Sequence, residues 1–322
     1  MNCLLFKLHF ETPVHFGSSD SALSLYTSEE TFCADTLFSA LCHTALSFYG
    51  PSGLETLCQW VKEGKLFLSD GMPWKNNVLY LPKPCMVADN GNKEVDANIR
   101  KLVKKTRWIP VGSFGAFADS LAGGEPYIPK KSSLRFGQHF EVTRAAVYED
   151  KDTMPYAVGA FAFDEGCGLY LLAKCSPDVQ QELRFLLEGL GKSGIGGKVS
   201  TGYGRFSVEC QPLDKAAQDE QYRWLYHALN HPAKRYLLLT TSLPSDAELD
   251  ETLQKAGFQI VRRGGFVQSS TYAKTSQKKR TQYFLAAGAV LCRPFAGDLY
   301  LVGEGAHPVY RYSRPILLGV DL

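Results

Sequence analysis

The beginning of the chain alternates between apolar and polar positions in the pattern of a β-strand. Residues 3–10 place Leu4, Phe6, Leu8 and Phe10 on one face, the period of a half-buried strand. The spacing then becomes helical from Asp35, the expected N-cap, to Gly50, where Gly50-Pro51 would end the helix. We expect a second short helix over 54–61 and a pair of strands at 66–68 and 78–81.

The middle of the chain interrupts this order. Residues 86–133 lose apolar periodicity, which predicts an insertion or a long hairpin, and the part from 98 to 107 carries five Lys or Arg residues and no acid. Periodic segments then return. They predict strands at 139–148, 156–163 and 168–174 and an amphipathic helix from 177 to 191.

A second pattern begins after a polar linker at 213–221. It predicts a strand over 236–242, a helix from its cap Ser245 to Ala256 with Gly257 as C′, and a strand over 258–263. Further strands are expected at 282–292, 298–302 and 309–318, without a clear helix between them. The chain therefore predicts an α+β fold of two ferredoxin-like (RRM-like) βαββαβ domains, 1–212 and 222–322, of which the second is incomplete or decorated.

Composition narrows the class of protein. The chain has 322 residues, 45% of them hydrophobic and 21% charged, so it can bury two cores. Its net charge is only +2, and any nucleic-acid site must therefore arise from local clusters of Lys and Arg. The nine cysteines form no CxxC pair, which favours a reduced, cytoplasmic protein, and no apolar run approaches the ~20 residues of a membrane span.

The densest motif is a glycine-rich loop at 191–205. Six glycines lie between Gly191 and Phe206, accompanied by Lys192, Lys198 and Arg205. The spacing does not fit a Walker A motif, and a helix precedes the loop where a phosphate-binding loop would precede a helix. Loop amides and basic side chains would thus hold an anion without help from a helix dipole, which suits a polyphosphate backbone.

A second cluster of charge follows. The 46 residues from Thr252 to Gly297 contain no Asp or Glu and eight Lys or Arg, interleaved with aromatic residues. Basic surfaces with aromatic side chains that stack on bases are typical of single-stranded RNA recognition.

Several motifs together resemble a known family. The segment Gly194–Phe206 resembles the glycine-rich signature of the CRISPR RAMP superfamily. With it, Pro13–Gly17, Asp35–Ala40, Thr143-Arg144, Arg262–Phe266, Ala286–Leu291 and His307–Tyr312 resemble the Csm4 family, the fourth Csm subunit of type III-A effector complexes. That resemblance covers essentially the whole chain.

The resemblance implies a non-catalytic subunit that caps the 5′ tag of the crRNA. Its implied partners are this single-stranded RNA, target RNA near the guide start, the large polymerase-like Cas10/Csm1 subunit and the backbone RAMP subunit Csm3. A thumb-like insertion within 86–133 would separate target from guide. No cofactor, metal or membrane is implied.

The resemblance and the two basic segments also give candidate RNA-binding residues. The loop would hold tag phosphates, Arg144 and 262–266 would line the same cleft, and Phe16, Tyr203 or Tyr272 would stack on a displaced base. The full set is His15, Phe16, Gly17, Arg144, Gly194, Gly196, Gly197, Lys198, Ser200, Thr201, Gly202, Tyr203, Arg205, Arg262, Arg263, Gly264, Phe266, Tyr272 and Lys274.

Two other functions remain open at this point. A metal-independent RAMP endoribonuclease could use His15, His43 or His307 as a general base, although His43 is expected to pack on the core side of its helix and the cutting relatives usually carry their loop near the C-terminus. A scaffold that binds only protein would use the basic stretch to dock an acidic partner. We expect no catalytic residues.

Overall fold

A computed structural model describes residues 1–17, 24–86, 96–130, 135–148, 151–214, 218–269 and 271–322. Its largest sheet has seven strands in the order β5-β4-β3-β8-β1-β9, with β2 also paired to β8. Neighbouring strands in the described part of this sheet run antiparallel. The strands are β1 (Asn2–Phe10), β2 (Leu66–Leu68), β3 (Met72–Lys75), β4 (Val78–Pro82), β5 (Trp108–Pro110), β8 (Cys167–Cys175) and β9 (Phe206–Pro212).

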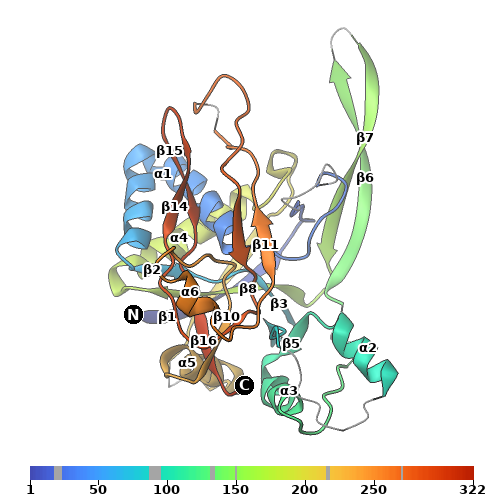
Figure 1. Ribbon diagram of the computed structural model, residues 1–322. Helices are drawn as coiled ribbons and strands as arrows, with labels where there is room; N and C mark the ends of the chain where they lie inside the picture. Colours follow the sequence, from blue (N-terminus) through green and yellow to red (C-terminus); the bar gives the residue numbers. More distant parts are fainter. Residues whose placement is uncertain (18–23, 87–95, 131–134, 149–150, 215–217, 270) are drawn as a thin grey trace.

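Two long helices cover one face of this sheet (Figure 1). They are α1 (Ala34–Lys62) and α4 (Pro177–Ser193). The two helices predicted over 35–61 form one element with a break at Gly50, whose φ of 68° is non-helical, so the predicted stop is a kink. Asp35 does not cap α1: Cys33 is the N-cap, and Asp35 lies in the first turn.

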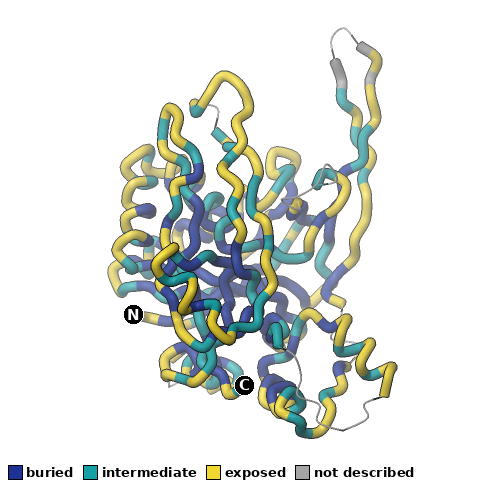
Figure 2. Tube along the Cα trace, in the orientation of Figure 1, coloured by how far each residue is buried: buried dark blue, intermediate teal, exposed yellow. Residues whose placement is uncertain are grey.

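The central strands are buried on both faces, whereas the sequence predicted a half-buried β1. Leu4, Phe6 and Leu8 lie in the core under α1 and α4, while Leu5 lies in a second core on the opposite face. Helix α5 (Glu220–Asn230) covers that opposite face, although the sequence was interpreted as linker up to residue 221. Figure 2 shows this buried centre and the exposed tips around it.

The segment predicted to contain a projecting insertion is instead mainly helical where it is described. It forms α2 (Ala97–Lys105), β5, the 3₁₀ turn η1 (Val111–Ser113) and α3 (Phe114–Leu121), and β5 extends the main sheet by pairing with β4. Residues 87–95 and 131–134 of the predicted insertion lie outside the described residues.

The projecting element is a hairpin that the sequence had assigned to the main sheet. Strands β6 (Gly137–Tyr148) and β7 (Lys151–Phe163) form a two-stranded sheet of their own, and an isolated bridge between Val14 and Phe161 connects its base to the segment after β1. In Figure 1 they extend well beyond the body of the molecule. The predicted strands 139–148 and 156–163 therefore exist, but they form an arm.

The second half contains small sheets and few helices. Strands β10 (Arg235–Leu238), β13 (Val290–Leu291) and β16 (Leu317–Val320) form one sheet, β11 (Ile260–Arg263) pairs with β12 (Gln282–Leu285), and β14 (Leu299–Glu304) pairs with β15 (Pro308–Tyr312). The predicted helix 245–256 is helical only over α6 (Leu249–Leu253). Gly257 is not its C′ residue: Lys255 has the positive φ, and a Cβ on Gly257 would lie 1.9 Å from the carbonyl oxygen of Cys85.

Both cores contain residues of both halves. Leu299 and Tyr312 pack in the core under α1, and Leu237 and Leu318 pack in the core on the opposite face. The hydroxyl of Tyr312 accepts a hydrogen bond from the backbone N–H of Leu68 (2.7 Å). These shared contacts fix the second half against the first and shape the space between them.

Candidate nucleic-acid interface

A cavity of about 1960 Å³ lies between α1, the glycine-rich loop and the second half. One wall is formed by 193–200, another by 256–264, and α1 contributes residues from Asp35 to Phe48. Eight Lys or Arg residues and four Asp or Glu residues line it, so its formal charge is positive although the whole chain is nearly neutral. The sequence predicted that the loop and 262–266 share a cleft; of that segment, Arg262, Arg263 and Gly264 line this cavity with the loop, and Gly265 and Phe266 do not.

The glycine-rich loop is held tightly against the segment that follows β1. The N–H of Gly197 donates to the carbonyl of His15 and that of Gly204 to the carbonyl of Pro13, each at 2.8 Å. Gly196 has φ 98°, and a Cβ there would lie 2.7 Å from the carbonyl oxygen of His15. Much of the glycine content therefore serves this close packing, so it does not all build an anion site as the sequence suggested.

Three consecutive amides of the loop remain available. Lys198 is left-handed (φ 63°, ψ 20°) and precedes the 3₁₀ turn η3 (Val199–Thr201). Within the described part of the chain, the N–H groups of Lys198, Val199 and Ser200 donate no hydrogen bond. A left-handed residue followed by a right-handed one makes successive N–H groups converge on an anion, and all three residues line the cavity.

His15 lies between the loop and the arm and is only 6% exposed. Its Nδ1 is 2.7 Å from the carbonyl oxygen of Gly159, which can only accept, so Nδ1 carries the proton. In the neutral ring, that tautomer leaves Nε2 as the nitrogen that can accept a hydrogen bond. His15 and Gly17 both line the cavity, as the sequence predicted for an RNA-binding site.

Two cation–π contacts fasten the arm to the loop. Arg144 and Tyr156 face each other across β6 and β7. The Arg144 guanidinium lies 5.8 Å from the ring centre of Tyr203, and the Lys198 ammonium lies 5.3 Å from that of Tyr156. Arg144 therefore braces the arm and, contrary to the prediction, does not line the cavity.

The two neighbouring arginines of β11 differ in their surroundings. Arg262 is exposed and lines the cavity beside Gly264. Arg263 makes a bidentate ion pair with Asp35, with Nη2 2.6 Å from Oδ1 and Nε 3.0 Å from Oδ2. Arg263, predicted to bind RNA, thus joins β11 to the start of α1, a structural contact between the two halves.

The aromatic side chains predicted to stack on bases are not placed for it. Phe16 is 5% exposed and packs against Phe10 and Phe32, and Tyr203 is 7% exposed. Tyr272 packs against His307 at 5.2 Å, outside the cavity. Burial explains the positions of Phe16 and Tyr203, whereas Tyr272 is half-buried and lies outside the cavity against His307.

The remaining predicted residues divide between the cavity and the surface. Gly194, Gly196, Gly197 and Ser200 line the cavity. The cavity lining does not include Thr201, Gly202, Arg205, Phe266 or Lys274. Arg205 is exposed, and its backbone N–H binds the hydroxyl of Thr12 at 3.0 Å.

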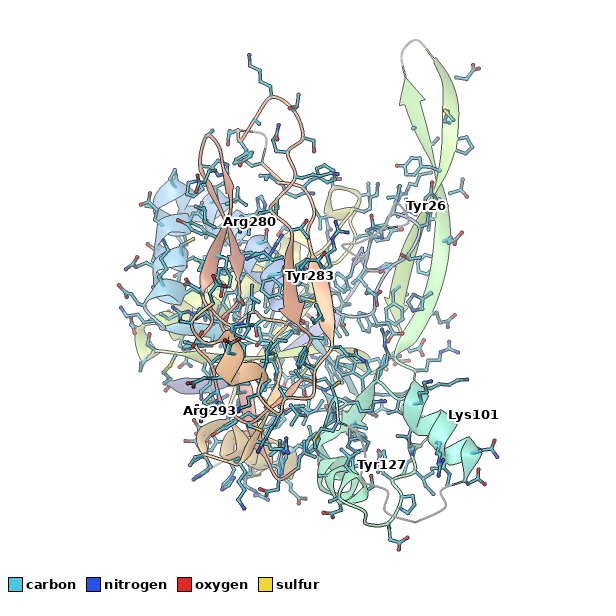
Figure 3. All side chains as sticks on the ribbon, viewed as in Figure 1. Tyr26, Lys101, Tyr127, Arg280, Tyr283 and Arg293 are labelled. Carbon is cyan, nitrogen blue, oxygen red and sulfur yellow. The ribbon has the colours of Figure 1, made fainter. Side chains whose placement is uncertain are left out.

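Sequence reasoning missed several cavity residues. His43, predicted to be packed, is exposed and faces the cavity, and Lys279 and Arg311 enter from the second half. The basic segment 98–107 contributes Lys104 and Arg107 to one end of the cavity, while Lys101 points away from the body of the molecule (Figure 3). A signal for His43 existed: Ser39, His43 and Ser47 recur every four residues along one face of α1.

The comparisons with known proteins agree with this architecture. Residues 231–320 match the model of the CRISPR Csm4 C-terminal domain. The CRISPR system Cms protein Csm4 of Mycobacterium tuberculosis is 35% identical over 322 residues, which cover 99% of this chain and 98% of the relative. The chain belongs to the Csm4 family. A Csm4 protein of Streptococcus thermophilus is 26% identical over 329 residues and covers 99% and 100% of the two chains.

Solved structures related to Csm4 proteins share the fold. A chain of the Csm3-Csm4 subcomplex in the type III-A CRISPR-Cas interference complex gives a TM-score of 0.66 at 16% identity, with all of both chains covered. A chain of the Csm1-Csm4 cassette in complex with cA4 gives 0.63 at 19% identity, covering 100% and 99%. Among the helices that the structure describes in this chain, none combines the length and the apolar composition that a membrane span requires.

Proposed function

We propose that this Csm4 family member is a non-catalytic subunit of a type III-A effector complex, and that it binds the 5′ tag of the crRNA in the cavity. The observation that carries the proposal is the positive cavity itself, with three available amides at 198–200 facing a space also lined by Arg262. Convergent amides and basic side chains match the phosphates of a single-stranded RNA.

The architecture supports the proposal. The strand order β9-β1-β8-β3 with α1 and α4 on one face is that of a ferredoxin-like βαββαβ unit, and we infer an incomplete unit of the same kind in the second half. The arm β6–β7 is the best candidate for a thumb that separates target RNA from guide. It contacts the loop that would hold the guide and extends from there beyond the body of the molecule (Figure 1).

The partners follow by analogy with the relatives. Solved assemblies named for Csm1-Csm4 and Csm3-Csm4 contain chains with this fold. We accordingly propose the large Cas10/Csm1 subunit and the backbone subunit Csm3 as its protein partners, with target RNA passing close to the arm.

The experiment is a binding titration of the full chain with labelled crRNA over a series of salt concentrations. Phosphate contacts release counterions, so affinity should fall linearly with the logarithm of salt. Lys198→Ala should reduce the slope by about one and Arg205→Ala by less, because only Lys198 lines the cavity. If crRNA does not bind the chain or its Csm complex at low salt, the proposal is wrong and the scaffold function is favoured.

One observation favours a second candidate, the metal-independent endoribonuclease. The hydrogen bond from Nδ1 of His15 to Gly159 fixes the tautomer whose Nε2, in the neutral ring, could accept a proton as a general base does. Incubation of the chain with end-labelled CRISPR repeat RNA in EDTA separates the two functions. Defined cleavage that disappears in His15→Gln would establish the nuclease, and intact RNA supports the binding subunit.

A further inference from the structure

The arginines at the bottom of the cavity carry more charge than their carboxylate neutralises. Asp35 is shared by Arg263, at 2.6 Å, and Arg311, whose Nε is 3.8 Å from Oδ2. The Arg311 guanidinium also donates to the carbonyls of Arg280 and Gly264, so it is fixed in place. Within the described residues these two guanidiniums form ion pairs with Asp35 alone, and Asp70, which also lines the cavity, attracts Arg263 without an ion pair.

Lys279 is a third cation at this site, where the carboxylates are Asp35 and Asp70. It lines the cavity, and the described residues offer its ammonium neither a hydrogen bond nor an ion pair. Burial lowers the pKa of Lys279, and Arg311 and Arg263 lower it further, while Asp35 opposes them. A partly buried ammonium without a partner is costly unless an anion reaches it.

His43 faces the same space from α1. Burial lowers the pKa of His43 and the charge of Lys279 lowers it further. The charged and titratable groups packed around this site are Lys279 from the segment before β12, Arg263 from β11, Arg311 from β15, Asp35 and Cys42 from α1, and Asp70 from the segment before β3. Ser39 and Ser47, one turn before and one turn after His43, also line the cavity and can donate hydroxyl hydrogens to an anion.

We infer that Lys279 and His43 form a second phosphate-binding subsite, on the α1 side of the cavity, separate from the glycine-rich loop. The inference rests on the proposed function and adds to it that the RNA is held at two points. The loop binds one phosphate group through the amides of 198–200. Lys279 binds another, with His43 and the serine hydroxyls beside it.

The neighbouring residue Lys278 provides a matched control. Its ammonium lies 5.8 Å from the ring centre of Phe266, which is 48% exposed, and Lys278 does not line the cavity. The two lysines carry the same charge in the same segment but differ in position. A nonspecific electrostatic effect would therefore treat them alike, whereas a subsite depends on Lys279 alone.

The test uses fluorescence anisotropy of the full chain with a labelled single-stranded RNA of about twelve nucleotides, a length comparable to the sites of OB-fold proteins that bind single strands. The RNA is made with a 5′-hydroxyl and with a 5′-phosphate, which distinguishes an internal phosphate from a terminal one. Lys279→Gln should weaken binding roughly tenfold, the size of one charged hydrogen bond, and reduce the salt slope by about one. Lys278→Gln should weaken binding less than about twofold.

Protonation gives a second readout. An anion beside His43 favours its charged form, so binding should take up a proton and strengthen as the pH falls from 8 to 6. His43→Gln should reduce this pH dependence. Equal effects of Lys278→Gln and Lys279→Gln, or an unchanged affinity of Lys279→Gln, would overturn the subsite. If the unmodified chain does not bind RNA at all, the proposed function fails instead.

Discussion

Replacement of Asp70 by asparagine should remove one step from the pH dependence of folding stability. Asp70 is buried where the two halves meet. Its Oδ1 accepts hydrogen bonds from the backbone N–H groups of Ala34 (2.8 Å) and Thr241 (2.9 Å), and Oδ2 accepts one from the hydroxyl of Thr241 (2.6 Å). Burial raises the pKa of Asp70 from 3.8 to about 6, although these hydrogen bonds lower it.

The sign and size of the effect follow from that pKa. The folded state holds the proton of the Asp70 carboxyl more tightly than the unfolded state does. The contribution of protonated Asp70 to folding stability is therefore full below pH 3.8 and is lost as the pH rises through about 6. A rise of about two pKa units corresponds to ~3 kcal/mol. Asparagine cannot ionise, and its Oδ1 can still accept from Ala34 and Thr241. The Asp70→Asn variant should therefore gain up to ~3 kcal/mol relative to the original chain between pH 4 and pH 7.

Urea unfolding of both chains at several pH values measures this difference. Other carboxylates titrate in both proteins, so their contributions cancel in the comparison. Asp70→Ala is the control, since it loses all three hydrogen bonds and should be less stable than Asp70→Asn throughout the range. Parallel stability curves for the original chain and Asp70→Asn would refute the reasoning. A curve of opposite sign would show that the N-terminus of α1 stabilises the carboxylate more than burial destabilises it.

Three further changes should act through single contacts. Arg263→Ala should lower the free energy of unfolding in urea by about 3 kcal/mol, because it removes one partner of a buried ion pair and leaves Asp35 with Arg311 at 3.8 Å. A decrease of less than about 1 kcal/mol would contradict this. Tyr312→Phe should cost about 1–3 kcal/mol, since the buried N–H of Leu68 loses its acceptor, as a shift in thermal unfolding would reveal. Gly196→Ala should lower the free energy of unfolding by on the order of 1–3 kcal/mol and weaken RNA binding. Its control is Gly115→Ala in α3, where a Cβ would meet open space, and this variant should be as stable as the original chain.

Most of the first half followed from periodicity. The strands 66–68 and 167–175 and the helix over 177–193 have local patterns that match their final structure. The arm was misassigned because alternation shows that a segment is a strand but not which strand it pairs with. Helix α5 was missed because its cap, Asp219, lies in a stretch rich in acids and amides that resembles a linker.

The candidate site was only partly predictable for a related reason. Glycine density located the loop, yet the amides of Gly197 and Gly204 donate hydrogen bonds to the carbonyls of His15 and Pro13, respectively, which are distant in sequence. Likewise, the acid-free segment indicated positive charge but could not show that Lys279 enters the cavity while Lys278 stays outside. Such choices depend on packing across the chain, which a local pattern does not contain.

The sharing of both cores between the two halves has a consequence for biosynthesis. The first half emerges from the ribosome with apolar surface that Leu299 and Tyr312 cover only when the end of the chain has been translated. The cavity also lacks Lys279 and Arg311 until then. A nascent chain therefore has no complete cavity, and a transcript truncated near its 3′ end would yield a product that chaperones and proteases treat as unfinished.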